Sequence, residues 1–176
     1  MWCTNIGLGS EEMADAIADQ VRELAYSSTF TDMTNAPSAG LAVKIAELTS
    51  GDLNRVHLTT GGSTAVDSAF RLIQYYQRSR GKPEKRHVIA RHQSYHGSTY
   101  ASMSIGCKTG DRAPEFAYIE DTVHHLSAPY FHHAPKGMDE PAFTRFLSQN
   151  SRTKYTNRGR TTSPPSLPNR PWARAG

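Results

Sequence analysis

The order strand, paired glycines, helix, strand constrains the fold of this chain more than any other feature. Residues 55–60 are predicted to form a short strand, which Gly61 and Gly62 end. A long helix is predicted over 63–80, and a second strand over 86–91. Two strands joined by a helix through short connections pair in parallel. The sequence therefore predicts an α/β fold with a mostly parallel sheet flanked by helices.

Helices are also predicted on both sides of this unit. Ser10 is a suitable N-cap for a helix over 10–25, and a second helix is predicted over 37–49. A short helix is predicted from about Ser98, and a last one after Asp139. The apolar residues expected on the buried face of the 63–80 helix are Ala65, Ala69, Leu72, Ile73 and Tyr76.

The predicted start of the 63–80 helix is a candidate anion site, with Ser63 as its expected N-cap. The first N–H groups of a helix have no partner within it, and the positive end of the helix dipole lies behind them. A phosphate can bind there, and the hydroxyl groups of Ser63 and Thr64 can add hydrogen bonds. The same residues suit an ordinary helix start after a loop. The pattern alone leaves both interpretations open.

Tyr95, His96 and Gly97 form a second candidate site just after the 86–91 strand. They are expected at the same end of the sheet as the paired glycines, where ligands of open α/β sheets bind. A tyrosine there can stack on a flat heteroaromatic ring. The alternative is a surface turn made by Gly97, with Tyr95 partly buried.

Taken together, the two stretches resemble the class III aminotransferases, a pyridoxal-phosphate-dependent family that includes the omega-transaminases. The resemblance covers about residues 1–147, with the motifs in the right order. The residues that match the family's cofactor-binding positions are Gly62 and Ser63 for the phosphate and Tyr95, His96 and Gly97 for the loop that stacks on the ring. Ala65 and Asp67 match flanking positions, although Asp67 is equally well interpreted as a solvated helix residue.

This resemblance implies a fold, a cofactor and partners. The fold is part of the large domain of the fold-type-I transferases, and the cofactor is pyridoxal 5'-phosphate. The expected substrates are an amine or amino acid and a keto acid, and the expected assembly is a homodimer. Trp2 lies where some members carry an aromatic residue of the substrate pocket, with simple packing as the alternative.

The sequence also departs from the family pattern. Gly61, Thr64 and Val66 stand where members usually carry Ser, Glu and Asn. No lysine matches the family's Schiff-base lysine, which lies far downstream of the Tyr-His-Gly loop. Because that lysine is the nucleophile of the family reaction, the chain is interpreted as a truncated member that is inactive by itself, with no catalytic residue assigned. The alternative is a non-catalytic remnant that binds a phosphate-bearing ligand, or an unfolded fragment.

Charge and composition set the C-terminal segment apart. Residues 151–176 hold six basic and no acidic residues, which leaves 14 basic against 16 acidic residues in 1–150. The pI of 9.2 therefore comes from this Ser-, Pro- and Arg-rich segment, which is predicted to be disordered. We divide the chain into an N-terminal helical segment (1–36), a partial cofactor-binding large domain (37–150) and this basic tail.

Other partners and compartments are not favoured. A nucleic-acid-binding module would depend on the tail alone, which has little aromatic interleaving and no recognition motif. No apolar stretch approaches the length of a membrane span. Two widely spaced cysteines, Cys3 and Cys107, make no disulfide framework. We expect a cytoplasmic protein that binds neither nucleic acid nor membrane.

The paired histidines at 124–125 and 132–133, near Asp121, raise the question of a metal site. Adjacent residues of a strand point to opposite faces, so each pair easily supplies only one ligand. No carboxylate or cysteine stands at a familiar zinc spacing from them. The sequence therefore predicts no metal centre.

Overall fold

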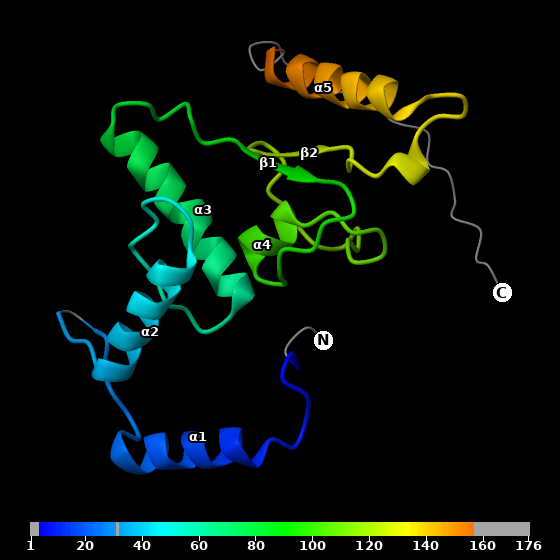
Figure 1. The fold of residues 1–176 in the computed structure, drawn as a ribbon. Coiled ribbons are helices and arrows are strands. Elements are labelled where there is room, and N and C mark those ends of the chain that lie inside the picture. Colours follow the sequence, from blue (N-terminus) through cyan, green and yellow to red (C-terminus); the bar gives the residue numbers. More distant parts are fainter. Residues whose placement is uncertain (1–3, 31, 157–176) are drawn as a thin grey trace. The chain divides into compact units, whose positions relative to one another are not determined.

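A computed structural model describes residues 4–30 and 32–156 of the chain, so Trp2 and residues 157–176 lie outside the described residues. The chain divides into two compact units, with the division between Leu58 and Thr59. Figure 1 shows the helices of each unit and the strand pair of the second. The predicted domain boundaries after residues 36 and 150 stay predictions.

The first unit contains two helices, both at predicted places. Helix α1 spans Glu11–Glu23, and the Ser10 hydroxyl accepts a hydrogen bond from the Met13 N–H at 3.2 Å. Helix α2 spans Ala36–Leu48 and is capped by Asn35. Neither helix buries a residue. No helix in the described part of the chain is long and apolar enough to cross a membrane.

The predicted strand over 55–60 is wrong, because these residues pair with no other strand in the described chain. An extended segment becomes a strand only when a neighbour supplies the ladder of hydrogen bonds. The predicted strand over 86–91 is confirmed as β1 (Val88–Arg91). It pairs in parallel with β2 (Val123–Leu126), a strand that was not predicted from the sequence. The Val-His-His-Leu sequence of β2 is short and half polar, so it lacks the alternation of apolar and polar residues that would predict a strand.

Helix α3 (Gly62–Ser79) was predicted correctly in extent, but its buried face was not. Phe70 is the buried residue of this helix, whereas Leu72, Ile73 and Tyr76 are 53%, 47% and 55% exposed. The reason is that α4 (Tyr100–Ile105) packs against the face of α3 that carries Ser63 and Asp67, which is not the predicted face.

A small core holds the second unit together and confirms the α/β fold. It combines one residue of α3, two of α4 and one from each strand: Phe70, Ala101, Ile105, Ala90 and Val123. The connection between β1 and β2 passes through α4, which was predicted at this place. This connection carries the Tyr95–Gly97 loop to the start of α3.

Helix α5 spans Glu140–Thr156 and so runs past residue 150. Asp139 caps it as predicted, since its side chain accepts a hydrogen bond from the Ala142 N–H at 2.7 Å. Residues 151–156 were expected to be disordered but continue this helix. The first prolines of the tail come only at 164–165, so nothing in the local sequence stops the helix at residue 150.

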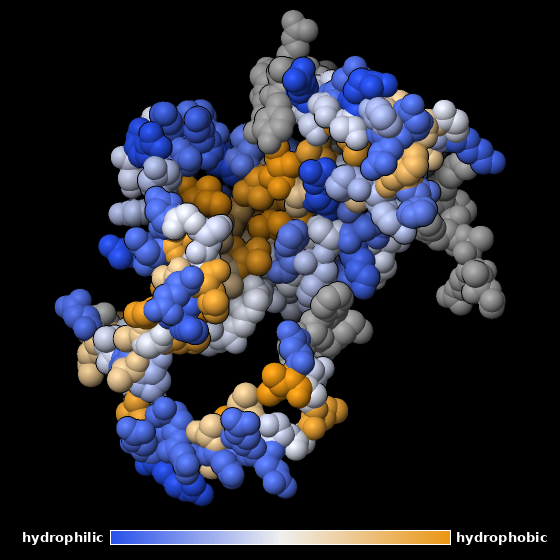
Figure 2. All heavy atoms as spheres, viewed as in Figure 1, coloured by the Kyte–Doolittle hydropathy of each residue, from blue (hydrophilic) through white to orange (hydrophobic). Residues whose placement is uncertain are grey.

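The exposed apolar surface leads to a stability prediction. Figure 2 shows hydrophobic residues gathered on one face of the second unit, and the exposed residues of α3 include Leu72 and Ile73. In the described chain the sheet has two strands, so each also has an unpaired edge. We expect the 176-residue chain alone to aggregate or to fold only partly, with a broad, concentration-dependent thermal transition. A sharp and reversible transition of a soluble monomer would contradict this.

Candidate cofactor site

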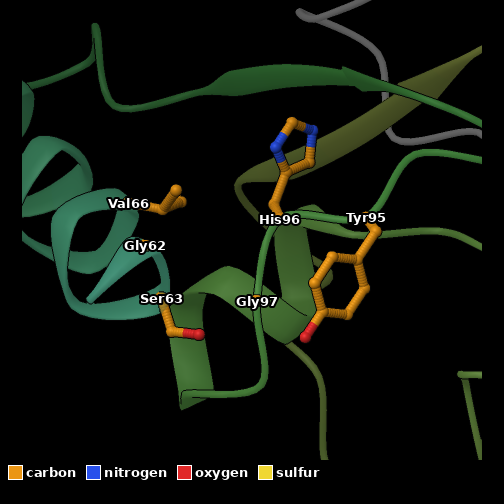
Figure 3. A pocket seen from close by; sticks show the side chains of 6 residues that line it. All are labelled: Gly62, Ser63, Val66, Tyr95, His96 and Gly97. Carbon is orange, nitrogen blue, oxygen red and sulfur yellow. The ribbon is translucent and has the colours of Figure 1, made fainter. Parts of the chain in front are cut away.

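The structure brings the two predicted stretches together around one pocket. It is an open pocket of about 380 Å³ between the start of α3 and the loop after β1. Its lining includes all five residues predicted to bind the cofactor: Gly62, Ser63, Tyr95, His96 and Gly97, together with Val66. Figure 3 shows the side chains of Ser63 and Tyr95 on either side of Gly97.

The first turn of α3 presents backbone N–H groups at this pocket. The first N–H that bonds within the helix is that of Ala65, which donates to the Gly61 carbonyl at 3.0 Å. The N–H groups of Gly62, Ser63 and Thr64 precede this bond and have no acceptor within the helix. The N-cap is Gly61 and not Ser63, so the predicted cap lies two residues too late in the sequence.

Ser63 is displaced from capping because its hydroxyl serves the neighbouring loop. Its Oγ accepts a hydrogen bond from the Ser98 N–H at 3.1 Å. A hydroxyl that accepts one bond still has its own hydrogen to donate, so Ser63 can also donate to an anion in the pocket. Thr64 differs, since its hydroxyl donates to the Gly61 carbonyl at 2.8 Å and it does not line the pocket.

Gly97 permits the close approach of the loop to α3. It is buried, and its φ of +131° is a conformation that side chains other than glycine rarely adopt. A Cβ atom at this position would lie 2.5 Å from the Ser63 Oγ and 2.8 Å from the Ser63 Cα. It would also lie 2.6 Å from the Ser102 Oγ. The pocket therefore depends on the absence of a side chain here.

Asp67 fixes α4 to α3 behind the pocket, a role that the sequence reasoning left open. Its Oδ1 accepts a hydrogen bond from the N–H of the fully buried Ser102 at 2.7 Å. The Thr99 hydroxyl donates to the Ser63 carbonyl at 3.3 Å and closes the same contact. The sequence position of Asp67 could have indicated this role. Asp67 lies four residues after Ser63 and therefore on the same face of the helix.

The residues of this pocket belong to a region of the chain that matches a known family. The sequence model of the family described as aminotransferase class-III matches residues 1–155 of this chain.

The chain belongs to the class III aminotransferase family.

Individual relatives cover the same region. The chain is 35% identical over 150 residues to a diaminobutyrate–2-oxoglutarate transaminase of Halomonas elongata, which is 82% of this chain and 31% of that protein. It is 39% identical over 106 residues to a putrescine–pyruvate aminotransferase of Pseudomonas aeruginosa, covering 60% of this chain and 23% of that one. The chain thus spans about a third or less of the length of these aminotransferases.

Solved transaminase structures share the fold. The crystal structure of the omega transaminase from Pseudomonas jessenii in complex with PMP aligns with a TM-score of 0.85 at 26% identity, over 90% of this chain and 35% of that one. An omega-transaminase from Thermomicrobium roseum aligns with a TM-score of 0.82 at 28% identity, over 88% and 34% of the two chains. These likenesses confirm that the described residues form part of a fold-type-I α/β domain.

The Tyr95 ring lines the pocket, whereas no lysine of the described chain does. Tyr95 is 65% exposed, and its ring is accessible from the pocket. None of the residues that line the pocket is a lysine. Lys108 is the first lysine after the loop in sequence, and its Nζ lies 3.6 Å from the Asp111 carboxylate.

The contacts of several histidines are with single partners in the part of the chain that the structure describes. The His87 Nδ1 lies 2.9 Å from the His124 Nε2, and the His125 Nε2 lies 2.9 Å from the Ile105 carbonyl. His132 and His133 both contact the Tyr130 ring. Over residues 4–30 and 32–156 no three His, Cys, Asp or Glu side chains gather in a metal-binding arrangement.

Proposed function

We propose that this chain carries the phosphate-binding and ring-contacting part of a pyridoxal-phosphate-dependent aminotransferase. The observation that carries the proposal is the meeting of the α3 N-terminus and the Tyr95–Gly97 loop around one pocket in a class III chain. When bound, pyridoxal phosphate carries the amino group and acts as the electron sink for transfer between an amine and a keto acid. The fit of the pocket to this group depends on two kinds of contact.

The first contact is with the phosphate. The N–H groups of Gly62 and Ser63 and the Ser63 hydroxyl are donors at the positive end of an 18-residue helix. The second contact is with the ring, which the exposed face of Tyr95 can cover. His96 and Gly97 hold the loop that brings Tyr95 to the pocket. These residues bind and orient the cofactor, and none of them is proposed to move a proton.

The substrates and the assembly are proposals drawn from relatives. Two relatives are named for reactions of diaminobutyrate with 2-oxoglutarate and of putrescine with pyruvate. We propose that the complete protein uses an amine or amino acid and a keto acid, acts as a homodimer in the cytoplasm, and places Trp2 at the substrate side of the site. Partners such as nucleic acid or membrane are not part of this proposal.

Activity of the 176-residue chain by itself is a separate question. We propose that this polypeptide alone does not catalyse transamination, because no lysine lines the pocket and none matches the family's Schiff-base position. A non-catalytic role in binding a phosphate-bearing ligand is the second candidate. The donors of the first turn of α3 favour it, since they need no lysine to hold a phosphate.

A titration of the purified chain with pyridoxal phosphate tests the proposal. We expect saturable binding that is about 5–10-fold weaker after Tyr95→Ala, because a stacked aromatic ring contributes roughly 1 kcal/mol. Tyr75→Ala removes a similarly exposed tyrosine from α3 outside the pocket and serves as the matched control. Ser63→Ala should weaken both pyridoxal phosphate and inorganic phosphate, whereas Tyr95→Ala should leave inorganic phosphate unchanged.

Borohydride reduction and intact-mass analysis of the same samples test the proposed inactivity. We expect no reduced adduct at a single lysine. One stoichiometric adduct would show a usable lysine and overturn the proposed inactivity, with Lys108 the first candidate. The cofactor proposal itself would be overturned if pyridoxal phosphate showed no saturable binding. It would also be overturned if neither Tyr95→Ala nor Ser63→Ala changed the affinity for pyridoxal phosphate.

A further inference from the structure

Cys107 lies against a histidine at the base of the Tyr95–Gly97 loop. Its Sγ is 3.2 Å from the His92 Nδ1, and both side chains are half-buried. The ring of His125 contacts that of His92, with 5.7 Å between the centroids. A thiol and an imidazole at this separation share a proton, in one direction or the other. The three side chains form a cluster outside the cofactor pocket, which we call the Cys107 cluster.

The backbone holds the thiol in this position. The Gln93 N–H donates to the Cys107 carbonyl at 2.8 Å, and the Cys107 N–H donates to the Ser94 carbonyl at 2.9 Å. The Gln93 side chain is further fixed by the Thr109 hydroxyl, to which its amide donates at 2.6 Å. Gln93 adopts a φ of +65°, which is uncommon for a residue other than glycine. The geometry between thiol and imidazole is therefore set by the main chain.

The Cys107 thiol needs His92 as its proton acceptor to become reactive. A thiolate is the reactive form of cysteine, and a neighbouring imidazolium stabilises it. The His125 ring is held by the Ile105 carbonyl, so it stays beside His92. Partial exposure gives a small reagent access to the sulfur.

We propose that Cys107 and His92 form a thiolate–imidazolium pair that makes Cys107 a modification site for peroxides. The thiolate sulfur attacks one oxygen of hydrogen peroxide, so an S–O bond forms as the O–O bond breaks. The leaving hydroxide takes the proton from His92 and becomes water. Cys107 is oxidised to a sulfenic acid while the peroxide is reduced. This inference does not depend on the proposed cofactor site.

The test follows Cys107 in the full 176-residue chain, in a dilute monomeric fraction whose circular dichroism shows that its helices are formed. Hydrogen peroxide is added with dimedone, which traps sulfenic acids, and the labelled Cys107 peptide is quantified by mass spectrometry over time. We expect labelling about 10-fold faster in the folded chain than in the chain unfolded in guanidinium chloride. His132→Ala, which alters an exposed histidine away from the cluster, should keep the fast rate.

Two substitutions of His92 separate proton transfer from a structural role. His92→Ala removes the imidazole, and His92→Asn leaves a polar group that can bond to the thiol but cannot take its proton. Both should lower the labelling rate to about that of the unfolded chain. A rate in the folded chain equal to that of the unfolded chain overturns the proposal. A fast rate that His92→Asn retains also overturns it.

Discussion

Replacing Gly97 with alanine is expected to open the contact between the Tyr95–Gly97 loop and α3. A methyl group there would meet the Ser63 backbone at 2.8 Å, and the backbone cannot move aside as a flexible side chain can. The φ of +131° adds a conformational penalty. We expect a loss of roughly 2–4 kcal/mol in the local stability of the contact. Hydrogen exchange of the α4 amides, followed by mass spectrometry, measures this loss directly.

A matched glycine separates the steric effect from the backbone effect. Gly110 has a φ of +91°, but a Cβ there would meet no atom within 4 Å. Gly110→Ala should therefore cost only about 1–2 kcal/mol and leave α4 protected from exchange. Pyridoxal phosphate binding should be lost in Gly97→Ala and retained in Gly110→Ala. Equal protection of α4 in the two variants would show that the loop does not depend on the close approach at Gly97.

Replacing Asp67 with alanine is expected to release α4 from α3. Its carboxylate accepts the N–H of Ser102, which is 0% exposed and would be left without this acceptor. A hydrogen bond to a charged acceptor contributes about 1.5–3 kcal/mol, and loss of one partner leaves a buried polar group unsatisfied. We expect a destabilisation in this range, read as faster exchange of the Ser102 amide and of the rest of α4.

The conservative variant tells whether the hydrogen bond or the charge matters. Asp67→Asn keeps an acceptor oxygen near the Ser102 N–H, so we expect less than half the effect of the alanine variant. Asp111→Asn, which removes an exposed carboxylate paired with Lys108, should change the exchange of α4 little. If Asp67→Ala leaves the Ser102 amide as protected as in the parent chain, the proposed attachment of α4 is wrong.

The candidate site could be found from the sequence because its parts are local. Paired glycines before a helix and a Tyr-His-Gly turn after a strand are each contained within a few residues, and each has a chemical reason for its composition. Their resemblance to the class III family then joined them into one site. The family match over residues 1–155 confirms that reading, while the individual roles of the five residues stay proposals.

Two of the failures concerned which segments pack against each other. The 55–60 segment has the composition of a strand, but a strand exists only where another strand pairs with it. In the described chain, no strand pairs with this segment. The buried face of α3 was misplaced because apolar residues such as Leu72 and Ile73 indicate a face that can be buried, not which face is covered. Only the position of α4 decides that Phe70 is inside.

What the sequence by itself determined is the family and the places of the helices. Helix caps such as Ser10 and Asp139 follow from the residues within a few positions of each. The tertiary structure alone decided which distant groups meet: Ser63 with Ser98, Asp67 with Ser102, and His92 with Cys107. Such contacts depend on the path of the chain between the two residues, and no local pattern in the sequence encodes that path.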